Sequence, residues 1–481
     1  MTLDAALDYA RSRTPQTLAD LMDWVRIPSI SSLSSHAAEM QQAAEWAAAR
    51  LRRAGLADVR ILPTTGHPLV FAQWLDAGPA APTVLLYGHY DVQPALDPAA
   101  WDSPPFEPQV RGERLYGRGT SDMKGQALAM IAALEAILQT AGRLPVNLKV
   151  LIEGEEEIGS RHLRAFIQAN RELLACDYAF NPDAGMLAPD TPSVAYALRG
   201  GLRMDLTVFG PRTDVHSGTF GGTLHNPAQA LAEILAGLHD EAGRVTLPGF
   251  YDKVRPISAE EHEELNRLRG SSVSAASASE FYLQASGAPA LWGDPDFTPV
   301  ERTTARPTLE VLAMHAGLPG EGVLNIVPAK AMAALSFRLV PFQEPADAAA
   351  QLRGWLETHV PPTVRWELTQ VGAGGRGVLV DRDSAGVRAI SQAYQDTWGV
   401  APAFIRLGGG IPVVAQLQEE LGVQSVLTGF ALPDDAAHGP NEHLHLPTWR
   451  SGILALVRFF HHAAAAPPLQ QAQRPEGAGA G

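Results

Sequence analysis

The stretch TVLLYGHYDV at residues 83–92 decides the fold, because a continuous apolar run leads directly into polar residues. Such a run is typical of a strand that is buried on both faces. NLKVLIEGEEE at 147–157 repeats the pattern, and KGQALAMIAALEAILQT at 124–140 has helical spacing and good helix formers. Together they predict a β-α-β unit, so we expect an α/β fold with a mainly parallel sheet flanked by helices.

Beyond this unit the pattern changes and indicates an inserted domain. GLRMDLTVFG at 201–210 alternates as a strand does, and NPAQALAEILAGLHD at 226–240 is an amphipathic helix with proline in its first turn. AMAALSFRLVP followed by EPADAAAQLRGWLETHV repeats strand and then helix. We therefore predict a main domain of residues 1–198 and 380–465, interrupted by an inserted α+β domain of residues 199–379.

Two segments have a less regular pattern. Residues 240–320 contain the charged run EEHEELNRLRG and the small-residue tract SSVSAASASE, which predict a loop-rich excursion. This excursion is either a plain surface feature or an element that selects substrate. Residues 466–481 lack apolar periodicity and predict a disordered tail.

The composition excludes several classes of protein. Across 481 residues the formal net charge is −15, from 37 basic and 52 acidic residues, which argues against a nucleic-acid groove. The single cysteine, Cys176, excludes an internal disulfide and fits a reducing compartment. The first 15 residues are charged throughout and predict neither a signal peptide nor a membrane span. We expect a cytoplasmic protein that does not bind membranes.

Four polar stretches suggest a metal centre. They are rich in His, Asp or Glu, each follows or interrupts an apolar run, and they read GHYDV at 88–92, SDMKG at 121–125, EGEEE at 153–157 and HGPNE at 438–442. In α/β proteins the carboxyl ends of strands carry such site residues. A pair of divalent ions needs a bridging carboxylate, terminal ligands on each ion and an open position for water. The four stretches together supply these groups.

Each residue type suggests a role. Asp122 is the natural bridge, and His89 and His438 offer one imidazole to each ion. Glu157 and a further acid complete the ligands. Because sequence neighbours usually point to different sides, Glu156 can face the attacking water as a general base.

Two assignments depend on position in the chain. Asp91 follows His89 by two residues and can accept the second imidazole N–H, which fixes the tautomer. For the fifth ligand, spacing leaves several acids open, namely Glu172, Asp177, Asp183 and Asp190. Asp183 follows the strand-like DYAFNP and is the preferred choice.

These motifs carry a resemblance to a known family. GHYDVQPA, W-x-x-x-P-F, GRGTSDMKG, EGEEEIGS, DVHSGTFGG, RLVP and HGPNE resemble the di-zinc peptidase family of carnosinase and cytosolic non-specific dipeptidase. More distant members are acetylornithine deacetylase and succinyl-diaminopimelate desuccinylase. The likeness runs from about residue 15 to residue 463, which is nearly the whole chain.

The resemblance implies a phosphorylase/hydrolase-like catalytic domain with an inserted lid and dimerisation domain. It assigns the metal ligands position by position, as His89, Asp122, Glu157, Asp183 and His438. By the same likeness Asp91 orients an imidazole, Glu156 is the general base, and the Asp122–Met123 peptide bond is cis. An aspartate at position 183 is typical of the dipeptidase branch.

Residues outside the four stretches are candidates for substrate binding. His216 in DVHSGTFGG can donate to a developing oxyanion, and the resemblance implies that it acts across a dimer interface. Arg338 can bind a carboxylate, or it is an ordinary charge beside a strand; Asn325 is a similar polar candidate. Backbone N–H groups of Gly408, Gly409 and Gly410 can approach an anion, or form a tight turn. Gly410 departs from the Ser or Thr typical of dipeptidases.

The sequence thus predicts hydrolysis of dipeptides or short peptides by a metal-bridged water with a glutamate base, in a homodimer. The ions are expected to be Zn²⁺, with Mn²⁺ or Co²⁺ as alternatives, because imidazole and carboxylate ligands accept all three. A deacylase of N-acyl amino acids would use the same groups. A non-catalytic binding protein would be expected to lack a ligand or the base, and all are present.

Overall fold

A computed structural model describes residues 3–271, 278–317 and 324–465. The predicted tail at 466–481 lies outside the described residues. Contacts divide the chain into two compact units. The first unit comprises Met1–Tyr196, Val380–Ile405 and Pro412–Gly481, and the second comprises Ala197–Leu379 and Arg406–Ile411.

The first unit is built on a mixed sheet in the order β1-β2-β6-β3-β7-β17-β8. Its central strands β6, β3, β7 and β17 pair in parallel, whereas β1, β2 and β8 pair antiparallel with their neighbours. The predicted parallel sheet is therefore confirmed at its centre. The strands are β1 (Asp58–Leu62), β2 (Leu69–Trp74), β3 (Thr83–His89), β6 (Asn147–Glu153), β7 (Tyr178–Asn181), β8 (Ser193–Leu198) and β17 (Ser425–Leu427).

Smaller strands lie outside this path. β4 (Gln109–Arg111), β5 (Arg114–Tyr116) and β18 (His443–His445) form a separate antiparallel sheet in the order β18-β5-β4. β16 (Ala403–Leu407) pairs with β8. This small sheet connects the segment before α3 with the segment that follows His438.

The helices of the first unit form two groups, defined by which helices contact one another. One group packs around the central helix and contains α1 (Leu3–Val25), α2 (Ala37–Ala54), α3 (Lys124–Ala141), α12 (Ala385–Trp398) and α14 (Leu446–Ala463). The other contains α4 (Leu163–Ala169), α5 (Arg171–Leu174) and α13 (Pro412–Leu421). Short 3-10 turns are η1 (Ser34–His36), η2 (Pro98–Ala100) and η3 (Glu156–Ile158). In the described chain, no helix combines the length and apolarity needed to cross a bilayer.

Helix α3 confirms the helix predicted at 124–140. It ends at Gly142, whose φ of +69° is the left-handed conformation that commonly terminates helices. Its first residue is buried, and the Lys124 ammonium donates to the carbonyl oxygens of Trp24 and Ile27. This buried start fixes the turn before α3, which carries Asp122.

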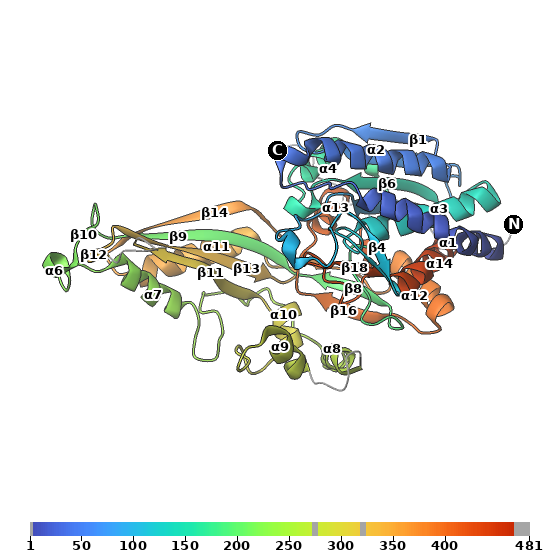
Figure 1. Ribbon diagram of the computed structural model, residues 1–481. Helices are drawn as coiled ribbons and strands as arrows, with labels where there is room; N and C mark the ends of the chain where they lie inside the picture. Colours follow the sequence, from blue (N-terminus) through green and yellow to red (C-terminus); the bar gives the residue numbers. More distant parts are fainter. Residues whose placement is uncertain (1–2, 272–277, 318–323, 466–481) are drawn as a thin grey trace. The chain divides into compact units, whose positions relative to one another are not determined.

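The second unit is a four-stranded antiparallel sheet in the order β11-β13-β9-β14. Figure 1 shows these long strands side by side. They are β9 (Gly200–Phe209), β11 (Thr308–Ala316), β13 (Lys330–Leu339) and β14 (Arg365–Gly375), with β15 (Val378–Leu379) following. β10 (Val215–His216) and β12 (Ile326–Val327) form a separate two-stranded sheet, and β12 comes shortly before β13 in the chain.

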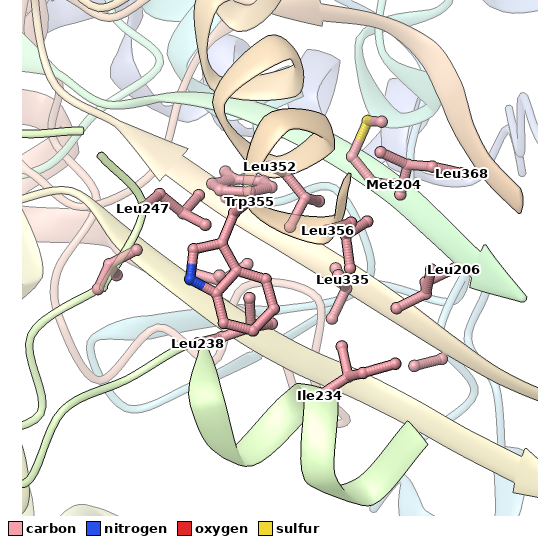
Figure 2. Close-up of a cluster of buried hydrophobic side chains, with 14 of the residues drawn as sticks. Met204, Leu206, Ile234, Leu238, Leu247, Leu335, Leu352, Trp355, Leu356 and Leu368 are labelled. Carbon is pink, nitrogen blue, oxygen red and sulfur yellow. The ribbon is translucent and has the colours of Figure 1, made fainter. Parts of the chain in front are cut away.

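One face of the long sheet is covered by two helices. Figure 2 shows Leu335 of β13 packed with Ile234 of α7 (Pro227–Gly237) and Trp355 of α11 (Pro345–His359). Alternate residues of β9, among them Met204 and Leu206, point into this core. The strands and helices predicted for the insert are therefore confirmed.

The segment at 240–320, predicted to be a loop-rich excursion, includes regular helices among its described residues. It contains α8 (Ala259–Ser271), α9 (Ala278–Ser286) and α10 (Pro299–Thr304), and α6 (Ser217–Phe220) lies shortly before it. Helix α10 begins with a capping box, in which Thr298 and Glu301 satisfy each other's backbone N–H groups. Sequence reasoning gave too little weight to such local helix signals.

Candidate metal centre

Parallel pairing brings the predicted ligands to one edge of the sheet. His89 is the last residue of β3, and Asp183 follows β7 by two residues. β3 lies between β6 and β7, and all three run in parallel, so their carboxyl ends meet. Glu156 and Glu157 start η3 immediately beyond β6. The strand order thus explains why these distant residues converge.

Asp122 lies between the two histidines. Its Oδ1 is 3.2 Å from His89 Nε2, and its Oδ2 is 2.9 Å from His438 Nε2. The Asp183 Oδ1 is 3.8 Å from His89 Nε2, and the Glu157 Oε2 is 3.1 Å from His438 Nε2. Each histidine therefore has its own carboxylate and shares Asp122 with the other. The Asp122–Met123 peptide bond is cis, as predicted.

The donor set fits two metal ions. Ligand atoms of His89, Asp122 and Asp183 lie within 4.8 Å of one another, as do those of Asp122, Glu157 and His438. The Nε2 atom of His89 is buried and has no hydrogen-bond partner within the described parts of the chain. A buried imidazole nitrogen without a partner is costly unless a ligand occupies it. Imidazole and carboxylate donors together are typical of zinc sites.

The electrostatics of the centre favour positive charge. Hydrogen bonds to Asp122 and Glu157 raise the pKa of His438 to about 10. Burial opposes a charge on His89, yet the nearby carboxylates of Asp122 and Asp183 raise its pKa. Burial also opposes ionisation of Asp122, but the two histidines hold its pKa below the usual value. Three carboxylates around two imidazoles thus create a place for cations.

Asp91 contacts both His89 and Glu157, through its main-chain oxygen as well as its carboxylate. The Nδ1 of His89 lies 3.1 Å from the main-chain oxygen of Asp91 and 3.4 Å from its carboxylate Oδ1. The other carboxylate oxygen accepts from the Glu157 N–H at 3.1 Å. These contacts leave Nε2 of His89 as the atom that faces the centre.

The neighbouring glutamates differ in their surroundings. Glu157 contacts His438 and accepts a hydrogen bond of 2.8 Å from the Gln93 amide. Burial, together with the negative charge of Asp183, raises the pKa of Glu156 to about 9. Glu156 therefore faces the same centre without being held by a histidine.

Sequence reasoning missed two residues that support the centre. The Glu442 carboxylate accepts from the N–H groups of Ser121 and Asp122, at 3.0 and 3.1 Å. Arg118 donates to Glu442 at 2.7 Å and to the His438 carbonyl at 3.1 Å. Both lie within quoted motifs, GRGTSDMKG and HGPNE, so their presence beside the ligands was the available signal.

The structure also distinguishes the acids considered for the fifth ligand. The Asp177 carboxylate accepts from the Thr83 N–H at 2.7 Å, at the start of β3. Asp183 instead lies with His89 and Asp122 at the opposite end of that strand. The geometry therefore favours Asp183.

In the second unit, His216 and Asn325 lie together. β10 pairs with β12, and the Ser217 N–H donates to the Asn325 carbonyl at 2.8 Å. The His216 Nδ1 accepts from the Gly218 N–H at 3.0 Å. Because Nδ1 is an acceptor, the neutral ring carries its proton on Nε2, and this N–H is exposed.

Arg338 lies with the glycine loop at a different place in the unit. It pairs with Gly201 in the sheet, and Arg199 nearby donates from Nε to the Gly408 carbonyl at 2.8 Å. Burial, together with the positive charge of Arg338, lowers the pKa of Arg199 to about 10. Sequence reasoning missed Arg199, which the structure places among the cationic groups of this end.

Two of the three glycines of this loop are required by close backbone contact. A Cβ on Gly410 would lie 2.5 Å from the Arg199 carbonyl oxygen, and one on Gly408 would lie 2.6 Å from that of Thr303. Gly409 has open space. The missing hydroxyl at position 410 is thus a consequence of how the loop packs on Arg199.

The two groups of candidate substrate-binding residues are separated by the length of β13. Asn325 precedes this strand and Arg338 is near its end, and a strand of ten residues spans about 30 Å. A dipeptide is far shorter. Within one chain, His216 and Arg338 cannot contact the same dipeptide.

Comparison with known proteins gives a consistent result. Residues 85–462 match the model of peptidase family M20/M25/M40. The chain is 30% identical to the Cys-Gly metallodipeptidase DUG1 of Candida albicans, over 96% of this chain and 97% of that protein. It is 31% identical to the cysteinylglycine-S-conjugate dipeptidase of Corynebacterium striatum, over 90% of this chain and 91% of that protein.

A solved structure is similar over nearly the same length. The M20 family metallo-carboxypeptidase Sso-CP2 of Sulfolobus solfataricus has a TM-score of 0.81 and 28% identity, covering 94% of this chain and 99% of that one. The match extends through both units. With its paired ligand groups around Asp122, the chain belongs to peptidase family M20/M25/M40.

Proposed function

We propose that the protein is a metal-dependent dipeptidase whose general base is Glu156. The observation that carries the proposal is the position of Asp122, whose two carboxylate oxygens face two different histidines. One bridging carboxylate between two ligand groups is the arrangement that a pair of divalent ions requires. The similarity to dipeptidases that act on cysteinylglycine supports small dipeptides as substrates.

His89, Asp122 and Asp183 would hold one ion, and Asp122, Glu157 and His438 would hold the other. Zn²⁺ suits this set of donors, although Mn²⁺ and Co²⁺ accept the same ligands. When bound, the ions make water more acidic and neutralise negative charge that develops on the substrate carbonyl.

Glu156 performs the proton transfers. It takes a proton from the attacking water and returns it to the amine that leaves when the peptide bond breaks. Burial and the nearby Asp183 carboxylate raise its pKa to about 9, so positive charge on the ligands is needed to keep it ionised. Loading of the centre and readiness of the base are thereby linked.

His216 supplies a donor to the oxyanion that forms during attack. Its Nδ1 accepts from the Gly218 N–H, which leaves the Nε2 proton free to donate. A donor held in advance stabilises the transition state more than the substrate. The main-chain carbonyl of Asn325 accepts a hydrogen bond from the N–H of Ser217, the residue after His216. Asn325 is therefore a second polar residue near His216.

Arg338 and the loop of Gly408, Gly409 and Gly410 are proposed to bind the carboxylate of the dipeptide. Arg199 is buried beside them, and its guanidinium donates to carbonyl oxygens. Arginine binds carboxylates through paired N–H groups. In the absence of a hydroxyl at position 410, this recognition depends on arginine and backbone N–H groups.

The protein is proposed to act as a homodimer in which each His216 serves the site of the other subunit. The support is the span of β13, which keeps His216 and Arg338 of one chain about 30 Å apart. β11 is an edge strand with exposed Val311, Leu312 and Met314. An apolar edge strand of this kind pairs readily with another chain. Together with α7, it is the proposed contact between subunits.

A deacylase of N-acyl amino acids is the second candidate, because its chemistry would use the same groups. The test is hydrolysis of a panel by the Zn²⁺-loaded protein, comparing Cys-Gly and Ala-Ala with N-acetyl amino acids of the same side chains. A dipeptidase cleaves the dipeptides with the higher kcat/KM. Preference for the N-acetyl series would overturn the proposal and favour the deacylase.

A further inference from the structure

A cluster outside the proposed dinuclear centre also has the groups of a cation site. Ligand atoms of Asp434, Asp435 and His443 lie within 4.8 Å of one another. Asp435 and His443 are buried, with 1% and 7% of their surfaces exposed, whereas Asp434 is exposed. Clusters of acidic residues are common at protein surfaces, so the evidence for a cation site comes from the two buried residues, Asp435 and His443.

Each of these two buried residues has one polar atom with no hydrogen-bond partner among the residues that the structure describes. Asp435 Oδ2 accepts from the Ser121 hydroxyl at 2.6 Å and from the Leu432 N–H at 2.9 Å, while its Oδ1 is buried and unpaired. His443 Nε2 is likewise buried and unpaired. Buried polar atoms are nearly always satisfied in native proteins, so a pair of such atoms in one cluster requires an explanation.

The tautomer of His443 is the one that binds metal. Its Nδ1 lies 2.9 Å from the Asn441 carbonyl, which can only accept, so Nδ1 carries the proton and Nε2 presents a lone pair. A second hydrogen bond of this kind orients most metal-binding histidines. The ring is also held at 4.8 Å from that of Tyr116, across the pairing of β18 with β5.

We propose that Asp434, Asp435 and His443 bind a third divalent cation of the Zn²⁺, Co²⁺ or Ni²⁺ class. An imidazole with two carboxylates suits these ions better than Ca²⁺ or Mg²⁺, which prefer oxygen donors alone. Three protein donors leave a position for water. Burial raises the pKa of Asp435 to about 7, and a cation would take the place of the proton that this carboxyl otherwise holds.

The ion would have a structural role. It would join Asp434 and Asp435 to β18, so that both ends of the segment carrying His438 are fixed. The Ser121 hydroxyl, which donates to Asp435, precedes Asp122 in the chain. The cation thus stabilises the loop and the turn that present two ligands of the dinuclear centre.

The test counts bound metal. Wild type and four variants are dialysed to equilibrium against buffered Zn²⁺, and zinc per chain is measured by elemental analysis. His443→Gln and Asp434→Asn should each bind one ion fewer than wild type. His445→Gln is the matched control on the same strand, since its Nδ1 is bonded to the Thr448 hydroxyl. Asp122→Ala should lose the ions of the dinuclear centre and keep this one.

A second measurement, of Tm with and without Zn²⁺, distinguishes a lost ion from a misfolded variant. Zn²⁺ should raise the Tm of Asp122→Ala, and adding His443→Gln to that variant should abolish the rise, since binding to the folded state alone stabilises it. Asp434 is exposed, so its substitution leaves the core intact. Equal zinc content in wild type, His443→Gln and Asp434→Asn would overturn the proposal, as would the absence of a Tm rise in Asp122→Ala.

Discussion

At the scale of single residues, Asp122 and Glu156 have different proposed roles in the chemistry. Asp122 contacts both histidines, so its proposed role is to hold the metal ions together with them. Around Glu156, burial and the negative charge of Asp183 disfavour ionisation more than the nearby His89 favours it. A residue whose charge depends on its neighbours in this way is typical of a proton-transfer group.

Substituting the two adjacent glutamates separates binding from catalysis. Glu156→Gln should retain its metal and lose about 10²–10⁴-fold in kcat, because the amide keeps the size and removes only proton transfer. Glu157→Gln should instead lower the metal content, because Glu157 contacts His438. Activity and elemental analysis of both variants check this. Near wild-type turnover in Glu156→Gln would assign the base elsewhere.

Glu153, at the end of β6, predicts a dependence of stability on pH. Burial raises its pKa from 4.5 to about 8, and it accepts from the Tyr87 and Ser160 hydroxyls. Between these values the folded chain holds a proton that the unfolded chain releases. The contribution of Glu153 to stability therefore falls as pH rises through this window, by up to about 1.4 kcal/mol per pH unit.

Glu153→Gln should remove this dependence, since its amide oxygen still accepts both hydroxyls and does not titrate. Urea denaturation at about pH 5.5 and about pH 7.5 measures the effect, with the wild-type free energy of unfolding falling more steeply than that of the variant. If the two proteins change in parallel, Glu153 is ionised in the folded state.

At the scale of elements, the glycine loop gives a test of backbone packing. Gly410→Ser places a Cβ 2.5 Å from the Arg199 carbonyl oxygen, whereas Gly409→Ser meets open space. The first should cost about 1–3 kcal/mol of stability and raise KM for dipeptides, because the loop must move away from Arg199. The second is the control and should leave Tm unchanged. Equal Tm values for both would show that the loop shifts freely.

The elements nearest the centre were predictable from sequence, because their signals are local. The apolar run before His89 and the helical spacing of α3 both correspond to observed elements. The pairing of His216 with Ile326, which brings it near Asn325, was not predictable, since over a hundred residues separate β10 from β12. The role of Glu442 likewise depends on contacts with a turn more than three hundred residues away.

The helices of the segment at 240–320 were missed for a different reason, because their signals are local. Its charge and small residues suggested loops, but helix α8 is formed by good helix formers such as the glutamates of EEHEEL. Arg406 and Gly408 were assigned to the main domain, whereas the structure groups Arg406–Ile411 with the second unit. Hydrogen bonds from Arg199 to this segment, invisible in the sequence, account for the difference.

At the scale of the whole molecule, the proposed dimer predicts complementation between inactive chains. A heterodimer of His216→Ala with Glu156→Gln has one site bearing both changes and one bearing neither. Mixed dimers should therefore regain about half of the wild-type activity per dimer if each site is assembled from two subunits. Mixed dimers confirmed by mass that stay inactive would place His216 in its own subunit's site or outside catalysis.

The central claim is that one carboxylate, that of Asp122, holds two ions needed for hydrolysis. The most direct test is to measure bound zinc and Cys-Gly hydrolysis together in Asp122→Ala. Because both histidines share this residue, the account predicts a loss of two ions per chain relative to wild type, along with turnover. A variant that keeps its full zinc content, or that still hydrolyses the dipeptide near the wild-type rate, would contradict it.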